Sequence, residues 1–476
     1  TPTNSTRSSR KSVNIPKATQ GTMISGDDLH PFSGISIDSR TVSKGDLFIA
    51  IKGNVHDGHR FIGDVIEKGG SGFLVEKGNI ADLSGISGEK KERVCIAVTD
   101  TTEALGDLAA FHRNRSDISV IAITGSNGKT TTRRMTAACM DKRMNVLETM
   151  GNFNNQIGLP LTLLRLENSH QSAVLELGMN RPGEIRRLAD ICKPDIGVIT
   201  NIGSAHLEQF DSVEGIMHAK GELLEKIVPK GVAVLNADDP LVLRLARETS
   251  RKILFFGLSE NAAVRAASIK NSGLGTAFTL ILPSEQIPID LKIPGGFSVL
   301  NGLAAASVGH LVGLSGHEIK DGLENFSPAP GRMNIFSSET GIHIIDDTYN
   351  ANPDSMNVAI RTLISLKKKD RAISVVGDML ELGEAAESMH KKIGALSARS
   401  GVKKLYAVGK FSGAVAQGAT DQGMDPGNIM VGSKDDIFIH LIGEIRTGDW
   451  ILVKGSRGMG MEEIVRRLKA WAKKQS

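Results

Sequence analysis

Residues 120–135 read VIAITGSNGKTTTRRM, and this stretch decides the fold of the chain around it. A largely apolar run, residues 118–123, leads into a turn with two glycines, after which a lysine and three threonines follow. Glycines let successive backbone N–H groups converge on phosphate oxygens, and a helix that begins there attracts an anion. The stretch therefore predicts a strand, a nucleotide-binding loop and a helix. The predicted nucleotide contacts are Gly125, Ser126, Asn127, Gly128, Lys129, Thr130 and Thr131.

The loop departs from the strict pattern G-x-x-x-x-G-K-[ST], because Ile123 stands where that pattern has its first glycine. The chemistry of the pattern is nevertheless retained. The Lys129 side chain can reach the β- and γ-phosphates of a nucleotide, and the Thr130 hydroxyl can bind Mg²⁺. A purely structural turn is the alternative. The order of strand, loop, lysine, hydroxyl and helix favours nucleotide binding over that alternative.

Composition and charge exclude several classes of protein. The chain has 476 residues, 40% of them hydrophobic, and a net charge of +4 with both signs spread along the sequence. A nucleic-acid groove is therefore not indicated. No apolar run approaches the roughly 18–20 residues that span a bilayer. The three cysteines are too far apart for a metal site, and such sparse usage fits a reducing compartment. We expect a cytoplasmic monomer without a nucleic-acid partner or a membrane span.

The order of expected elements divides the chain into an α/β protein of three domains. Residues 1–20 are basic, rich in serine and threonine and free of acids, which predicts a disordered tail or a transit-peptide remnant. Short β-type segments over 21–115 predict a small mixed domain. Strands and helices alternate over 116–328, which predicts a P-loop-like parallel sheet. Prolines in FSPAPGR mark the next boundary, and a Rossmann-like unit follows over 329–476.

Two residues at the ends of predicted strands are candidate ligands for a magnesium ion beside the loop. Glu176 ends an apolar strand, and ligands of open α/β sheets gather at that carboxyl edge. A metal ligand and a solvated strand end are equally good interpretations of it. His206 also follows a strand end, although position alone favours an ordinary loop histidine. Lys220 lies within a helical pattern, where the sequence by itself favours a surface lysine.

The motifs together resemble those of the Mur ligases, ATP-dependent enzymes that form amide bonds in peptidoglycan synthesis. The resemblance runs from about residue 35 to residue 464. It implies an N-terminal domain that binds a UDP-sugar, a central domain that binds ATP, and a Rossmann-like C-terminal domain that closes over both. The motifs, in order, are DSRTVSKGDLFIAIKG, DGHRF, TGSNGKTTT, NFNNQIGLPLTLL, LELGMNRPGEI, TNIGSAHLEQF, AKGELL, APGRMN, DDTYNANPDSM, VVGDMLELGE and LVKGSRGMGMEE.

The resemblance also implies roles for single residues. Lys220 matches a lysine that is carbamylated and helps to hold magnesium, with Glu176 and His206 as the other ligands beside Thr130. Arg332 matches an arginine that crosses to the γ-phosphate, and we expect Lys129, His206, Lys220 and Arg332 to carry catalysis. Asp347 matches a ribose contact. Asn301 matches an adenine contact.

The adenine segment is where the chain departs from the family. The usual segment is G-x-H-N-x-x-N, but Phe297 replaces its histidine and Ser298 its first asparagine. Only Asn301 keeps its identity. We therefore expect the base to be bound more weakly or by different contacts.

Substrate contacts are also implied by the resemblance. The uridine and sugar–peptide side corresponds to Ser39, Arg40, Asp57, Gly58 and His59. Without the resemblance, these motifs are better interpreted as a turn and a loop tip. Asn155 is expected to face the same substrate, and Asn350 and Asn352 to face the acceptor. A turn rich in proline and asparagine is an equally good interpretation of the last two.

The closest branch of the family joins D-alanyl-D-alanine to UDP-MurNAc-tripeptide through an acyl phosphate, with ATP and Mg²⁺ as cofactors. Two alternatives remain. The first is the sister ligase that adds the third amino acid, although GDMLELGE stands where its diaminopimelate-specific form has D-N-P-R. The second is a non-catalytic nucleotide-binding relative, motivated by Phe297 and Ser298. The sequence leaves the third peptide residue open between meso-diaminopimelate and L-lysine.

Overall fold

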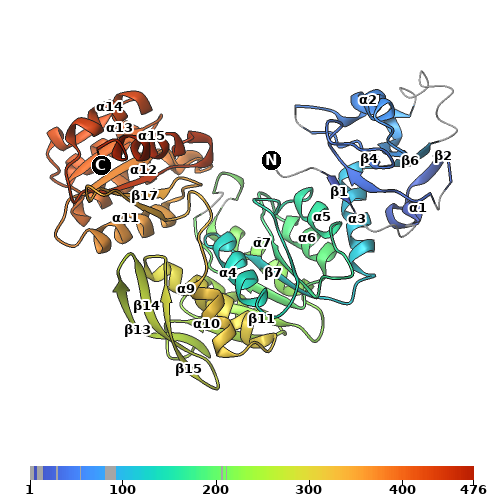
Figure 1. Cartoon of the computed structure of the whole chain (residues 1–476), viewed down its shortest axis with the longest axis horizontal. Helices are drawn as coiled ribbons and strands as arrows, with labels where there is room; N and C mark the ends of the chain where they lie inside the picture. Colours follow the sequence, from blue (N-terminus) through green and yellow to red (C-terminus); the bar gives the residue numbers. More distant parts are fainter. Residues whose placement is uncertain are drawn as a thin grey trace.

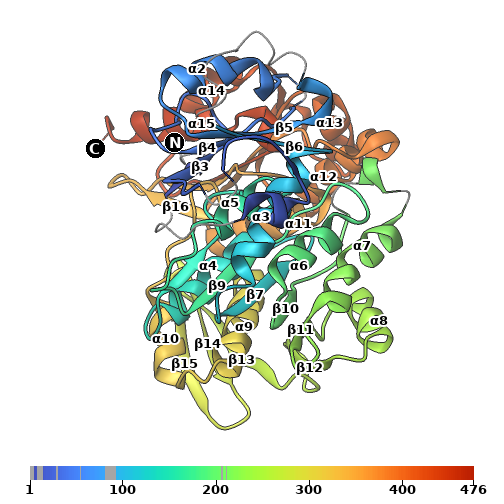
Figure 2. The same cartoon turned by 90° about the vertical axis from the view of Figure 1, so that its right-hand side faces the viewer.

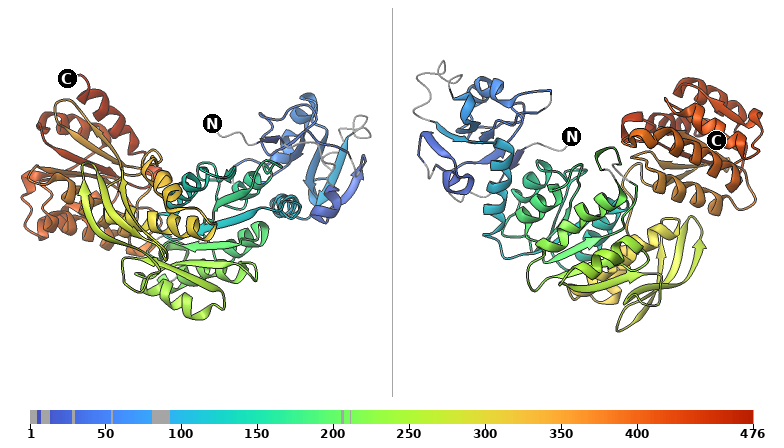
Figure 3. Two further views of the ribbon diagram at one scale, coloured as in Figure 1. Left: turned by 60° about the horizontal axis from the view of Figure 1, so that its bottom comes forward. Right: turned by 180° about the vertical axis from the view of Figure 1, so that it is seen from behind.

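The computed structural model describes residues 5–7, 14–27, 30–53, 55–80, 93–204, 207–210 and 212–475. It contains three sheets that follow one another along the chain. Figure 1 shows them as three lobes, with the central lobe between the N-terminal lobe in blue and the C-terminal lobe in red. Figures 2 and 3 show the same arrangement from other sides. The predicted α/β class with three sheet-containing units is confirmed.

The first sheet has six strands in the order β1-β3-β4-β5-β6-β2. Its inner strands β3 to β6 are parallel, and the edge strands β1 and β2 are antiparallel to their neighbours. Helix α3 (Thr101–Arg113) leads from this sheet to the central one. The remaining bounds are β1 Ser5–Arg7, α1 Ile15–Thr19, β2 Thr22–Ser25, β3 Gly34–Ser36, β4 Leu47–Ile49, α2 Ile62–Glu67, β5 Gly72–Glu76 and β6 Val94–Val98.

The prediction of a disordered tail over 1–20 is wrong for two segments. Strand β1 pairs with β3, and helix α1 forms over Ile15–Thr19. The helix has a local cause: Asn14 accepts a hydrogen bond from the Lys17 N–H, and Pro16 lies in the first turn, where its missing N–H costs nothing. Ile15 is then buried at 3% exposure. The prediction from composition therefore overlooked the start of a helix and a buried residue, Ile15.

The central sheet has nine strands in the order β15-β14-β13-β12-β11-β10-β7-β9-β8. Neighbouring strands from β13 to β8 pair in parallel, and the β13–β14 and β14–β15 pairs at one edge are antiparallel. Buried apolar side chains cover both faces, which explains why its inner strands are nearly continuous apolar runs. Its strands are β7 Ser119–Thr124, β8 Val146–Glu148, β9 Ser172–Glu176, β10 Ile196–Ile199, β11 Val232–Asn236, β12 Lys252–Gly257, β13 Val264–Ser272, β14 Gly275–Ile281 and β15 Gln286–Leu291. Its helices are α4 Lys129–Met140, α5 Gly158–Leu163, α6 Glu184–Cys192, α7 Val213–Lys226, α8 Pro240–Glu248, α9 Gly296–Leu311 and α10 Gly316–Glu324.

The third sheet has the order β16-β17-β21-β18-β19-β20, with only β16 antiparallel. Two apolar clusters pack helices against its two faces. Each sheet apart from β1 lies within one of the ranges 21–115, 116–328 and 329–476, which we propose as the domains. The bounds are β16 Asn334–Ser337, β17 His343–Asp347, α11 Pro353–Lys367, β18 Ala372–Gly377, α12 Ala386–Ser400, β19 Lys404–Val408, α13 Ser412–Asp421, β20 Ile429–Val431, α14 Lys434–Glu444, β21 Trp450–Lys454 and α15 Glu462–Ala472.

Candidate active site

The predicted phosphate loop connects β7 to α4. Gly125 and Gly128 have φ of +149° and +82°, conformations that favour glycine. Space requires glycine as well, since a Cβ on Gly125 would lie 1.9 Å from Thr200 Oγ1 and one on Gly128 would lie 2.3 Å from Asn301 Oδ1. The two glycines therefore allow the loop to pass close to its neighbours.

The far side of the loop is held by the segment after β10. The Ser126 and Asn127 N–H groups donate to the main-chain and side-chain oxygens of Asn201, both at 2.9 Å. Asn201 Nδ2 and Thr200 Oγ1 donate back to the Asn127 carbonyl. These bonds leave the first-turn N–H groups of α4, which have no intrahelical partner, to receive an anion.

Lys129 lies across the mouth of the loop. Its Nζ donates to the carbonyl oxygens of Gly125 and Ser126 at 2.6 and 3.3 Å. Burial lowers the pKa of Lys129, and the nearby Arg332 lowers it further, while Glu176 acts in the opposite direction. The lysine therefore lies where it can neutralise phosphate oxygens.

Glu176 and Thr130 provide an oxygen pair that fits magnesium. Thr130 Oγ1 donates to Glu176 Oε2 at 2.8 Å, and Glu176 is 2% exposed. Two neighbouring ligands of an octahedral Mg²⁺, each about 2.1 Å from the ion, lie about 3 Å apart. Asn154 Nδ2 donates to the other carboxylate oxygen at 2.8 Å, and Arg133 Nε lies 3.6 Å from Oε2. Both neighbours orient the carboxylate, and the sequence analysis missed both.

Lys220 is the predicted ligand whose surroundings are most unusual. It lies on α7, is 1% exposed and lines the same cleft as the loop. The interpretation as a surface lysine is therefore wrong. Burial lowers its pKa well below the ordinary value, and Lys129 adds to that effect. Within the described residues, no acidic side chain pairs with it. His206 lies outside the described residues, so its role stays a prediction.

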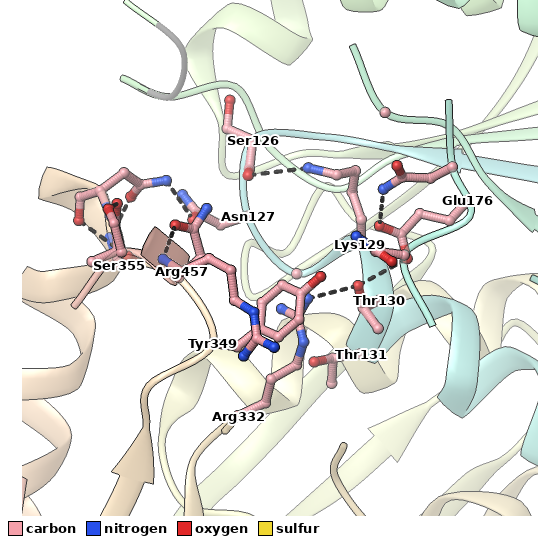
Figure 4. A pocket seen from close by; sticks show the side chains of 18 of the residues that line it. Ser126, Asn127, Lys129, Thr130, Thr131, Glu176, Arg332, Tyr349, Ser355 and Arg457 are labelled. Atoms are coloured by element: carbon pink, nitrogen blue, oxygen red, sulfur yellow. Dashed lines mark hydrogen bonds between the residues drawn. The ribbon is translucent and has the colours of Figure 1, made fainter. Parts of the chain in front are cut away.

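Arg332 brings the C-terminal domain to the phosphate loop. Its NH2 group donates to Thr130 Oγ1 at 2.9 Å, and its guanidinium lies 4.0 Å from the centre of the Tyr349 ring. Figure 4 shows Tyr349 between Arg332 and Arg457 on the C-terminal side of the cleft. An aromatic face attracts a guanidinium, so Tyr349 supports the arginine in this position.

The expected nucleoside contacts lie beside the loop. Asp347 pairs with Lys454 at 2.6 Å, and Asn301 Oδ1 accepts from Thr132 Oγ1 at 3.2 Å. The Ser298 hydroxyl donates to the carbonyl of Pro294 at 2.9 Å, so its hydrogen is already used in a bond to the residue before the cap of α9. Asp347, Asn301 and Ser298 line the cleft together with Phe297. Their contacts with adenosine stay a prediction.

The cleft over the loop has a volume of about 710 Å³ and collects residues from all three sheet-containing units, with only Thr102 from the first. Asn155 lines it, and its Oδ1 accepts from the Gly158 N–H at the start of α5. Asn350 and Asn352 line it as well, and Asn352 caps helix α11. The phosphate, metal and acceptor candidates therefore share one space.

The N-terminal candidates lie elsewhere. None of Ser39, Arg40, Asp57, Gly58 and His59, all of which the structure describes, lines this cleft. Arg40 is exposed and pairs with Asp38 at 2.7 Å. His59 is buried, and its Nε2 accepts the Glu76 N–H at 3.0 Å, so Nδ1 carries the proton and donates to Asp57 at 2.6 Å. The loop-tip interpretation of His59 is wrong, and its substrate role stays a prediction.

His59 makes a testable contribution to stability. Replacing it with alanine leaves the partly buried Glu76 N–H without its acceptor and removes the Nδ1–H bond to Asp57, which costs about 1–3 kcal/mol of unfolding free energy. Urea unfolding without substrate measures the loss. Arg40→Ala is the control, because an exposed ion pair contributes about 0–1 kcal/mol. Equal unfolding midpoints for the two variants would contradict the structural role.

Comparison with known proteins agrees with this geometry. Family profiles match the Mur ligase family catalytic domain over residues 31–113, the Mur ligase middle domain over 123–309 and the Mur ligase glutamate ligase domain over 331–457. The chain is 37% identical over 441 residues to a UDP-N-acetylmuramoyl-tripeptide–D-alanyl-D-alanine ligase of Escherichia coli strain K12, covering 91% of this chain and 93% of that protein.

Two solved structures have the same architecture. A crystal structure of MurF from Acinetobacter baumannii has a TM-score of 0.88 at 33% identity, covering 97% of this chain and 99% of that one. MurF from Thermotoga maritima in complex with ADP has a TM-score of 0.82 at 27% identity, covering 93% and 98% of the two chains. The similarity spans all three sheets and the cleft between them. The chain therefore belongs to the Mur ligase family.

Proposed function

We propose that the chain is an ATP-dependent ligase that joins D-alanyl-D-alanine to UDP-MurNAc-tripeptide and yields UDP-MurNAc-pentapeptide. One observation carries the proposal: Lys129 and Thr130 of the central domain and Arg332 of the C-terminal domain converge on one cleft. Relatives that cover more than nine-tenths of this chain and bear that ligase name support the choice of substrates. Because ATP and a nucleotide-linked sugar would be its substrates, we propose that the reaction takes place in the cytoplasm.

The geometry suits phosphoryl transfer to a carboxylate. A carboxylate of the tripeptide attacks the γ-phosphorus of ATP, the bond to the bridging oxygen breaks, and ADP and an acyl phosphate form. The acceptor amine then attacks the acyl carbon, an amide bond forms, phosphate leaves, and one proton passes to solvent. Lys129 and Arg332 neutralise charge on the transferring oxygens, while the cleft holds the reactants in line.

Magnesium fits the donor set beside the loop. Thr130 and Glu176 would hold it, with His206 as a further predicted ligand. When bound, the ion would stabilise negative charge on the phosphoryl oxygens. The neighbouring Asn154 and Arg133 hold the Glu176 carboxylate in this orientation.

We extend the proposal to a carbamate on Lys220. Burial lowers the pKa of Lys220 and so favours its neutral amine, whose nitrogen can add to CO₂, forming an N–C bond and releasing one proton to solvent. The resulting anion would lie near Lys129, which supplies the opposite charge. Two carbamate oxygens would then face the cleft that Lys220 lines.

The acceptor is the part of the proposal that most needs its own test. The protein should be supplied with ATP and Mg²⁺, with UDP-MurNAc-tripeptide plus D-Ala-D-Ala, and separately with UDP-MurNAc-dipeptide plus meso-diaminopimelate or L-lysine. Mass spectrometry should detect the pentapeptide product alone. A tripeptide product would instead identify the sister ligase, and ATP binding without any product would identify a non-catalytic relative.

A further inference from the structure

A side-chain hydrogen bond connects the phosphate loop directly to the C-terminal domain. Asn352 Nδ2 donates to Asn127 Oδ1 at 2.9 Å, and the two residues are 225 positions apart in the chain. Asn127 lies in the loop between β7 and α4, and Asn352 lies at the start of α11. Figure 4 labels Asn127, the acceptor of this bond, and Ser355, which follows Asn352 on α11. The contact belongs to neither the metal ligands nor the arginine that reaches the loop.

Both asparagines are held firmly on their own domains. Asn352 Oδ1 accepts the Ser355 N–H at 2.8 Å, so the carbonyl end caps α11 and the amide end faces Asn127. The Asn127 N–H donates to Asn201, and its carbonyl accepts from Thr200 and Asn201. The bond therefore joins two ordered elements rather than two mobile side chains.

The segment that carries Asn352 is also anchored behind the contact. Lys454 Nζ donates to the Asn350 carbonyl at 2.8 Å, and Ser456 Oγ donates to the Ala351 carbonyl at 3.2 Å. A second contact between the domains lies two residues further along the chain, where the Ser204 N–H donates to Asp354 Oδ2 at 2.8 Å. The carboxyl edge of the third sheet is thus connected through Asn352 to the loop.

We propose that Asn127 and Asn352 are positioning residues that set the register of the C-terminal domain on the phosphate loop. Arg332 and Asn352 contact the same loop-and-helix element, one at Thr130 and the other at Asn127. Losing the amide bond leaves the approach of Arg332 less well defined. The inference rests on the proposed ligase function only for its effect on turnover.

Asn352→Ser separates this role from helix capping. Serine is as good an N-cap as asparagine, so α11 keeps its cap, but the hydroxyl cannot also reach Asn127. The loss of one neutral hydrogen bond changes an equilibrium constant by about two- to tenfold. We expect kcat to fall by about that factor, with the Kd for ATP changed less than about twofold. Asn127→Ser should cause the same loss, and the double variant should be no worse than either single one.

The control and a second measurement keep the test decisive. Ser433 has the same kind of capping box on α14, so Ser433→Asn should leave kcat unchanged.

Spin labels at exposed Glu248→Cys and Gln422→Cys report the distance between the two domains, since the native cysteines are buried. With a non-hydrolysable ATP analogue, Asn352→Ser should broaden the distance distribution. Additive losses of kcat, or an unchanged distribution, would overturn the positioning role. A parent protein without turnover would refute the ligase function, and the distances would still test the contact.

Discussion

Arg332→Ala is expected to lower kcat by about 10²–10³-fold while changing the Kd for ATP less than about threefold. The arginine belongs to the C-terminal domain and reaches Thr130 Oγ1 of the phosphate loop from outside the nucleotide domain. Its charge is therefore used when phosphoryl oxygens gain charge, more than when ATP first binds. Steady-state kinetics with saturating substrates and calorimetric titration of ATP measure the two quantities.

Arg332→Lys provides the matched control. Lysine keeps the positive charge but loses the planar group that lies on the Tyr349 ring and donates to Thr130. We expect its kcat to fall between those of the parent and the alanine variant. An equal loss of kcat and ATP affinity in Arg332→Ala would assign the arginine to nucleotide binding rather than to the transition state.

Lys220→Ala is expected to lose at least about 100-fold in kcat, by analogy with removal of a preorganised charged group. The lysine is 1% exposed and close to Lys129, so alanine would remove the proposed anion that balances that charge. Added formate or acetate should restore part of the activity by occupying the space of the carbamate. Nuclear magnetic resonance of the parent protein with ¹³C-labelled CO₂ should show a carbamate signal that the variant lacks.

Lys226→Ala on the same helix is the control for the loss of a lysine. Lys226 is partly exposed and pairs with Asp190 at 2.7 Å, so its removal should change kcat little. Full activity of Lys220→Ala would exclude the carbamate. A loss of activity in both variants would point to damage of α7 rather than to chemistry at one side chain.

Much of the fold was predictable because it depends on local patterns. The stretch at 120–135 folds as the predicted strand, loop and helix, and alternating strands and helices form the predicted parallel sheets. The start of the chain was predicted wrongly because composition outweighed a short local signal. Asn14 and Pro16 begin a helix there, and the buried Ile15 holds it in place.

The candidate site was predictable only where a motif carries its own chemistry. Gly125, Lys129 and Thr130 are consecutive parts of one loop, so their joint position follows from the sequence. Asn154 and Arg133 were missed because each is an ordinary residue type that becomes informative only next to Glu176. The burial of Lys220 was missed although the sequence carried a signal, because Lys220 lies three or four residues from Ile216, Met217, Leu223 and Leu224, on the apolar face of its helix.

Tyr349 and the amide contact were missed for a related reason. The amide contact joins residues 225 positions apart in the chain, and no spacing encodes such a contact. Tyr349 follows Arg332 much more closely, but the two side chains meet only through the pairing of β16 with β17. The Tyr349 ring lies next to Arg332 because Tyr349 follows the end of β17, at the sheet edge where Arg332 also lies. Contacts between domains therefore had to come from the structure.

The most direct test of the ligase function is phosphate release from ATP and Mg²⁺, with UDP-MurNAc-tripeptide and D-Ala-D-Ala each present or omitted. The acyl-phosphate mechanism predicts sustained release only when both are present, together with a pentapeptide product identified by its mass. Release with neither substrate would show a plain ATPase, and absence of release with both would contradict the proposed reaction.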